Sequence, residues 1–305
     1  MPNQPPTTAP LQLTAAERNE IAVRKATCPF LGSAVASGLL PVRNDVAQPL
    51  VSIEDVVKLG NTGKDSDLGN LLRIFCEGNH AFMPGTSGAL DQPVPPNMLS
   101  LDLPGSLGSH AGHSGILQGN PTIIGSGRFS EADFNRLMSY ASGEVIKRSD
   151  IGKFIARNVA NDHAAHAPGL KTAVLAIKDL LLLAGQVVEA LTDKVTGSDD
   201  PVENRKLFTR LTKLLGEDHL VGSAGEFGLL AAFLANSPRT QHVDAAISAE
   251  PAYAITDIRT MFRDHRFPDG WEHWTKKASD WVVNTGAIAL AAQREFLHHK
   301  ARNIP

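Results

Sequence analysis

Apolar residues recur at helical spacing along most of this chain, and this pattern constrains the fold more than any other feature. The periodic segments lie near 15–26, 67–82, 130–142, 149–159, 168–193, 201–215, 224–236, 256–265 and 272–299, and the capping pattern at 52–55 predicts the start of another short helix. Several follow a capping hydroxyl or a proline, the usual signals of a helix start. No run alternates apolar and polar residues as a half-buried strand would. The sequence therefore predicts a mainly α fold, in which Cys76 is a core residue inside a helix.

The stretch from Met83 to Gly127 differs from the rest, because prolines recur in it among glycines and serines. Proline lacks the backbone donor that a helix interior needs, so regular helix is excluded over most of this length. A connection this long inside a compact domain is usually functional or disordered. We expect a disordered tail over residues 1–14 and a single all-α domain over 15–300 with this long irregular segment at its centre.

Composition excludes several classes of protein. The 305 residues are 42% hydrophobic and 20% charged, as in a globular domain, and the net charge of -3 offers no electrostatic case for a nucleic-acid partner. The most apolar stretch, 173–191, is interrupted by Lys178, Asp179 and Glu189, which indicates a buried helix and no membrane span. The first residues lack the basic and apolar regions of a signal peptide. We expect a cytoplasmic protein without a membrane partner.

Cys28 is the first candidate for chemistry, since Pro29 directly follows it. Proline suits the first position of a helix, which places Cys28 at the N-cap. There the free backbone N–H groups and the helix dipole favour a thiolate over a thiol. Cys28 is therefore a candidate metal ligand or nucleophile, and the alternative is a small buried apolar residue.

Glu226 is the second candidate, because its carboxylate stands among apolar neighbours in the segment 225–234. Burial would raise its pKa and allow it to give and take a proton near neutral pH. His219 lies seven residues earlier, on the same face if the helix begins that early. The alternative is a solvated or capping carboxylate at a helix start.

His110 and His113 lie in the Ser/Gly-rich part of the irregular segment. Their spacing alone is a weak indication of a metal site, and the same spacing recurs at His163 and His166. Neither pair has the glutamate of a His-Glu-x-x-His zinc site.

Together these stretches resemble the haem-thiolate peroxidases, the family of fungal chloroperoxidase and the unspecific peroxygenases. The family carries its axial cysteine in Pro-Cys-Pro near the N-terminus, before a short helix and a Leu-Pro turn, and this chain has Cys28-Pro29 and Leu40-Pro41. The family's distal acid lies late in the chain on a largely apolar helix, where Glu226 falls. The segment 262–271, FRDHRFPDGW, is similar to the Phe-x-Asp-x-Arg-Phe-Pro-Asp-Gly-Phe segment of the family and is the most specific of the three markers.

The resemblance implies an all-α fold enclosing haem b, with Cys28 followed by Pro29 on the proximal side of the iron and Glu226 on the distal side. It implies an enzyme that uses hydrogen peroxide to oxidise a small organic substrate. The thiolate would favour cleavage of the O–O bond, and the carboxylate would move a proton between the two oxygens.

Three departures from the family pattern concern the site. Thr27 replaces the first proline of Pro-Cys-Pro, and His219 stands where peroxygenases have an arginine. The nearest match to the family's Glu-His/Gly-Asp-x-Ser motif is 109–113, where both carboxylates are absent, so the magnesium or manganese site beside the haem is expected to be absent. His110 could keep the role of the histidine that bonds the distal acid, and His113 could lie beside the cofactor.

Two other readings stay open at the level of the sequence. The chain could be a haem-binding protein of the same fold without peroxidase turnover, as the missing acidic motif would favour. It could also be a helical scaffold without haem, in which Cys28 is structural.

Overall fold

Helices dominate the computed structural model, as the sequence predicts. It describes residues 9–26, 28–82, 95, 97–101, 117–118, 128–129, 131–161, 219–241 and 250–302. Of the interpretable residues, 62% are helical and 10% lie in strands, so the fold is mainly α. The predicted helices 168–193 and 201–215 lie outside the described residues, as does most of the irregular central segment.

The described helices are close to the predicted segments. They are α1 (Ala15–Glu20), the π-helical turn η1 (Ile21–Lys25), α2 (Pro29–Ala36), α3 (Ile53–Gly60), α4 (Leu68–Phe82), α5 (Glu131–Met138), α6 (Arg148–Asn161), α9 (His219–Leu234), α11 (Ile255–Phe262), the 3₁₀ turn η2 (Trp271–His273) and α12 (Ala278–Arg302). Thr14 caps α1 in a reciprocal capping box with Glu17. Ser52 precedes α3 at the predicted position, but its side chain makes no capping hydrogen bond.

Short antiparallel strands join these helices, which the sequence did not predict. A three-stranded sheet has the order β1 (Val42–Asn44), β2 (Pro49–Ser52), β3 (Met98–Ser100). Two further pairs join β4 (Leu117–Gln118) to β5 (Arg128–Phe129) and β6 (Val145–Lys147) to β7 (Ala252–Ala254). None exceeds four residues, which is too short for alternation to stand out from the helical pattern.

Residues 1–14 were predicted to be a disordered tail, and this is wrong for residues 10 and 11. Pro10 forms an isolated bridge with Arg43, and the amide of Leu11 donates to the carbonyl of Val42 at 2.8 Å. The chain is therefore paired with the edge of β1 before α1 begins.

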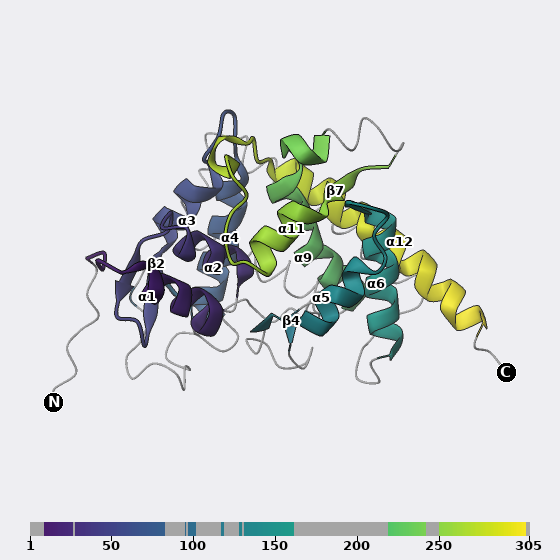
Figure 1. Cartoon of the computed structure of the whole chain (residues 1–305), viewed down its shortest axis with the longest axis horizontal. Helices are drawn as coiled ribbons and strands as arrows, with labels where there is room; N and C mark the ends of the chain where they lie inside the picture. Colours follow the sequence, from purple (N-terminus) through teal and green to yellow (C-terminus); the bar gives the residue numbers. More distant parts are fainter. Residues whose placement is uncertain are drawn as a thin grey trace.

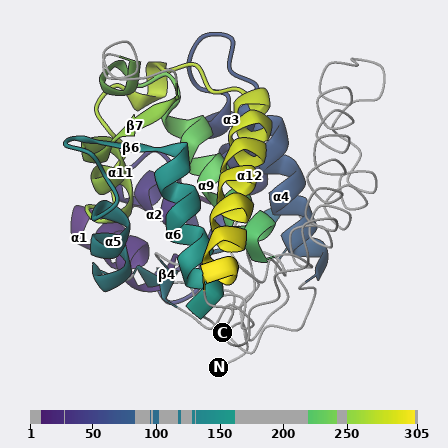
Figure 2. The same ribbon diagram turned by 90° about the vertical axis from the view of Figure 1, so that its right-hand side faces the viewer.

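The long helices pack on one another in the second half of the molecule. In Figure 1 the elements of the first hundred residues lie on the left, α6 and α12 lie on the right, and α9 lies between them. Figure 2 shows α6, α9 and α12 side by side. A Cβ on Gly228 of α9 would lie 2.0 Å from the Thr285 hydroxyl of α12, and one on Gly152 of α6 would lie 2.6 Å from the Ala291 side chain. Glycine thus allows these three helices to approach closely.

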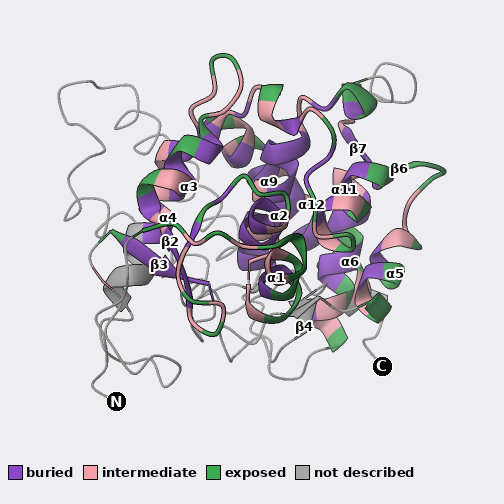
Figure 3. Cartoon of the chain, turned by 60° about the vertical axis from the view of Figure 1, so that its left-hand side comes forward, coloured by how far each residue is buried: buried purple, intermediate pink, exposed green. Residues whose placement is uncertain are grey.

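The core extends from these helices to α2. Colouring by burial places α2 and α9 near the centre of the molecule, with most of their residues buried (Figure 3). Each of these two helices carries one of the candidate functional residues.

Candidate functional site

Cys28 occupies the start of α2, as its position before proline predicts. It is the N-cap residue, with extended backbone angles (φ -97°, ψ 115°), and Pro29 is the first helical residue. The Cys28 carbonyl accepts the first helical hydrogen bond from the Gly32 amide at 2.9 Å. A Cβ on Gly32 would lie 3.2 Å from the Ala22 carbonyl, so this first turn lies close to η1. Cys28 is half-buried as a whole residue.

The state of the Cys28 thiol differs from the sequence expectation. Burial raises its pKa to about 11, and this effect exceeds the opposing influence of the backbone amides of Leu31 and Phe30. The helix start therefore acts in the predicted direction, but burial outweighs it, and Cys28 holds its proton at neutral pH while no cation is bound.

Glu226 belongs to the same site. Its negative charge is one of the causes that raise the pKa of Cys28, so the carboxylate of α9 acts electrostatically on the thiol at the start of α2. Glu226 is half-buried, whereas its neighbours Gly225 and Phe227 are buried. The structure thus places two residues that lie 198 positions apart in the sequence within electrostatic range of each other, and both are half-buried.

The segment 262–271 supplies neither Cys28 nor Glu226, but its aromatic residues pack against the two helices that carry them. Phe30, in the first turn of α2, stacks on Phe233 of α9 with ring centroids 3.9 Å apart and an interplanar angle of 8°. Phe267 and Trp271 complete the cluster, stacked on each other at 4.1 Å. The sequence motif therefore forms an aromatic wall that joins the two helices, a role that its sequence alone did not reveal.

Hydrogen bonds extend this contact along one side of α2. The Ser33 hydroxyl donates to the Met261 carbonyl at 2.7 Å, and the Phe267 amide donates to the Ser37 hydroxyl at 3.2 Å. Residues 30, 33 and 37 lie on one stripe of a helix, three and four positions apart. These contacts attach α2 and its C-cap Ser37 both to the end of α11, at Met261, and to the segment that follows α11.

The predicted histidines have different outcomes. His110 and His113 lie outside the described residues. The helix α9 begins at His219, five residues earlier than the predicted start at 224. His219 and Glu226 therefore belong to the same helix, two turns apart, as the prediction that they share a face requires. The side chain of His219 is outside the described part of the structure.

The donor set limits which metal group the site could hold. Among the described residues no three His, Cys, Asp or Glu side chains cluster as ligands of a metal ion. Zinc sites usually need three or four protein ligands. Haem needs one or two, because the porphyrin nitrogens supply the rest, and a cysteine thiolate is a known axial ligand. Cys28 alone would therefore be enough as a protein ligand of haem, whereas a bare ion at this place would need further donors.

Comparisons with known proteins leave the family open. No family model matches the chain, and no curated protein matches it. Within the described ranges, none of the helices is long and apolar enough to cross a membrane.

Proposed function

We propose that this protein is a haem-thiolate peroxidase or peroxygenase that uses hydrogen peroxide to oxidise a small organic substrate. The single observation that carries the proposal is the pairing of Cys28 at the start of α2 with Glu226 on α9, close enough for one charge to act on the other. The proposed cofactor is haem b, with Cys28 as the axial ligand. When bound, haem would supply the oxidising chemistry that the side chains lack.

Cys28 would change its protonation state on binding. The thiol is protonated in its buried position, and ligands of this kind release their proton when they bind a cation. Once iron neutralises the sulfur, burial and the amides of Phe30 and Leu31 would surround the thiolate with a dry pocket wall and two positive dipole ends. The same burial that disfavours a free thiolate would thus keep competing water from the ligand.

Glu226 would move the proton of the oxidant. The carboxylate could accept a proton from peroxide at Oε1 or Oε2 and give it back, while haem, when bound, would supply the electrons for O–O cleavage. Its half-buried position gives the carboxylate access to a small oxidant. The roles of His110, His113 and His219 beside this acid stay predictions.

A cytoplasmic location is part of the proposal. Neither of the two cysteines, Cys28 and Cys76, forms a disulfide bond. This is in keeping with a reducing compartment. Cell fractionation tests it.

Absorption spectroscopy of the purified protein with added haem tests the ligand. We expect a red-shifted Soret band for the reduced carbon monoxide complex of the wild-type protein, and its loss in Cys28→Ala. Cys76→Ala is the matched control, since Cys76 is the other cysteine of the chain and is buried inside α4. Retention of the shifted band in Cys28→Ala refutes Cys28 as ligand, and absence of haem binding refutes the cofactor.

Peroxide-dependent oxidation of a phenolic dye tests the acid. We expect kcat to fall about 10²–10⁴-fold in Glu226→Gln, the usual contribution of a general acid–base. Glu131→Gln is the control, because this half-exposed carboxylate lies 3.6 Å from Arg263 on the surface. Equal turnover in wild type and Glu226→Gln contradicts the catalytic role, and a thiolate spectrum without turnover favours a haem-binding protein of the same fold.

A further inference from the structure

We propose that Trp271 is a positioning residue that fixes the spacing between the thiol of Cys28 and the carboxylate of Glu226. The proposal rests on the proposed function only in assigning a purpose to this spacing. Its basis is that one buried side chain contacts both helices that carry the pair.

The contact with α9 is a hydrogen bond near the end of that helix. The indole Nε1 of Trp271 donates to the carbonyl of Phe233 at 3.2 Å, and the side chain is fully buried. Phe233 follows Glu226 by seven residues, which is about two helical turns. The carbonyls of the last turn have no partner within their helix, so this bond fixes α9 at an end that its own backbone leaves free.

The contact with α2 is made by the ring. The Trp271 ring lies 5.8 Å from that of Phe30, tilted by 58°, and 6.1 Å from that of Phe233 in an edge-to-face arrangement. Phe30 follows Cys28 by two residues. The rings of Phe30, Phe233 and Trp271 thus contact one another, so a shift of either helix changes at least two ring contacts.

A buried lysine restricts Trp271 from another direction. The Lys276 ammonium lies 4.0 Å from the ring centroid of Trp271, a cation–π distance. It donates to the carbonyls of Trp274 at 2.7 Å and Thr62 at 2.9 Å. The indole ring is therefore packed against aromatic rings and also against a cation that two loops hold in place.

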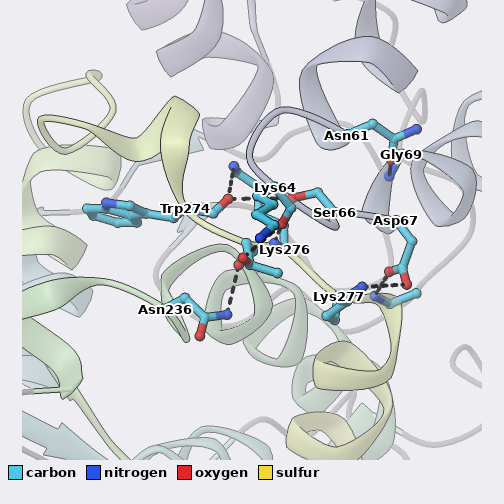
Figure 4. Close-up of polar contacts among 11 residues, drawn as sticks. Asn61, Lys64, Ser66, Asp67, Gly69, Asn236, Trp274, Lys276 and Lys277 are labelled. Carbon is cyan, nitrogen blue, oxygen red and sulfur yellow. Dashed lines mark hydrogen bonds and ion pairs between the residues drawn. The ribbon is translucent and has the colours of Figure 1, made fainter.

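Those two loops form a clasp, which we define as residues 61–69 together with 274–278 (Figure 4). The Lys276 amide donates to the Ser66 hydroxyl at 3.0 Å, and the Ala278 amide donates to the Asp67 carboxylate at 2.7 Å. Gly63 has φ +88°, and a Cβ there would lie 2.1 Å from the Trp274 carbonyl, so glycine is required for the close approach. The clasp gives Lys276 a fixed position over Trp271.

Trp281 also bonds to α9, at the residue before Glu226, and so controls for the loss of such a bond by itself. It is buried, and its Nε1 donates to the Gly225 carbonyl of α9 at 3.1 Å. Its ring packs edge-on at 6.0 Å against Phe75 of α4. Trp281 and Trp271 thus make the same kind of bond to α9, but Trp271 adds the contact with α2. Trp281→Phe is therefore a matched control.

A molecular ruler tests the proposal without haem. Glu226→Cys in a Cys76→Ala background leaves two thiols, at positions 28 and 226, and a graded series of dithiol-reactive cross-linkers reports the length that joins them fastest. We expect Trp271→Phe to lower the preference for the best length about fivefold, the change in population that a typical hydrogen bond is worth. Trp281→Phe should leave the preferred length and its selectivity unchanged.

The outcomes are separable from those of the haem experiments. An unchanged length preference in a folded Trp271→Phe overturns the proposal, as does an equal loss in Trp281→Phe. If Trp271→Phe fails to fold, Lys276→Met decides, because it leaves Trp271 intact and removes the cation from its ring. A loss of selectivity in Lys276→Met supports the proposal, and unchanged selectivity overturns it. All of these results hold whether or not the protein binds haem.

Discussion

The stack of Phe30 on Phe233 predicts a measurable energetic coupling between α2 and α9. Aromatic pairs contribute about 0.5–1.5 kcal/mol beyond the area that they bury. Phe233→Leu removes two such pairs, with Phe30 at 3.9 Å and with Trp271 at 6.1 Å, and we expect it to lower the free energy of unfolding by about 1–3 kcal/mol. Phe30→Leu removes three pairs, since its ring also contacts Phe267 at 5.3 Å.

The double-mutant cycle isolates the stack itself. The Phe30–Phe233 pair is lost in either single variant but only once in the double variant, so the two single effects should exceed the double effect by about 0.5–1.5 kcal/mol. Urea unfolding followed by far-ultraviolet circular dichroism measures these free energies. Phe154→Leu combined with Phe233→Leu is the control, because Phe154 packs at 6.1 Å against Phe227 elsewhere on α9.

Additive effects would refute the reasoning. If the Phe30 and Phe233 variants add to within about 0.3–0.5 kcal/mol, as independent sites do, the rings do not couple the two helices. The aromatic wall would then be ordinary core, and the relative position of Cys28 and Glu226 would have to depend on other contacts.

Three further predictions concern single positions. Gly228→Ala should lower the free energy of unfolding by about 1–3 kcal/mol, because its Cβ would lie 2.0 Å from the Thr285 hydroxyl and 2.9 Å from the Thr285 amide. Urea unfolding should show that adding Thr285→Ala restores part of this loss, and full wild-type stability of Gly228→Ala would contradict the close approach. Burial lowers the pKa of Lys276 from 10.5 to about 8, so the folded protein loses this proton at a lower pH than the unfolded chain does. The free energy of unfolding of the wild type, measured relative to that of Lys276→Met, should therefore rise between about pH 8 and 10.5 and stay at its highest value above that range; this gain is lost as the pH falls through 8. A difference in urea unfolding that does not change with pH would exclude this titration. The rate of alkylation of Cys28 by iodoacetamide in the haem-free protein should rise with a pKa near 11, and Glu226→Gln should lower that pKa. The same pH dependence of alkylation in wild type and Glu226→Gln would show that the Glu226 charge does not act on the thiol.

Local signals in the sequence were enough to predict the helices of this fold. Pro29 predicted the start of α2 and the N-cap position of Cys28, and the apolar periodicity predicted α4 with Cys76 in the core. The short strands were missed, since a pair such as β4 and β5 gains its register from a partner and carries too few residues for a period.

The site was predictable only in part, because its decisive contacts are long-range. Cys28 and Glu226 were each found from local chemistry, but the expectation of a thiolate considered only the helix start. Burial by residues distant in sequence has the larger effect on the pKa of Cys28. Likewise the ring of Phe30 gave no sign that it would meet Phe233 and Trp271, since nothing local encodes a contact across more than two hundred residues.

The attachment of α2 to α11 and to the segment after it has a consequence for the order of biosynthesis. Ser33 bonds Met261 across 228 residues, and Trp271 must be present before the wall behind Cys28 can close. At a translation rate of about 5–20 residues per second, the thiol would leave the ribosome roughly 12–50 s before its final neighbours. During that interval Cys28 has neither its buried environment nor Glu226 opposite it, so a cofactor could be captured in its native setting only after nearly the whole chain has been made.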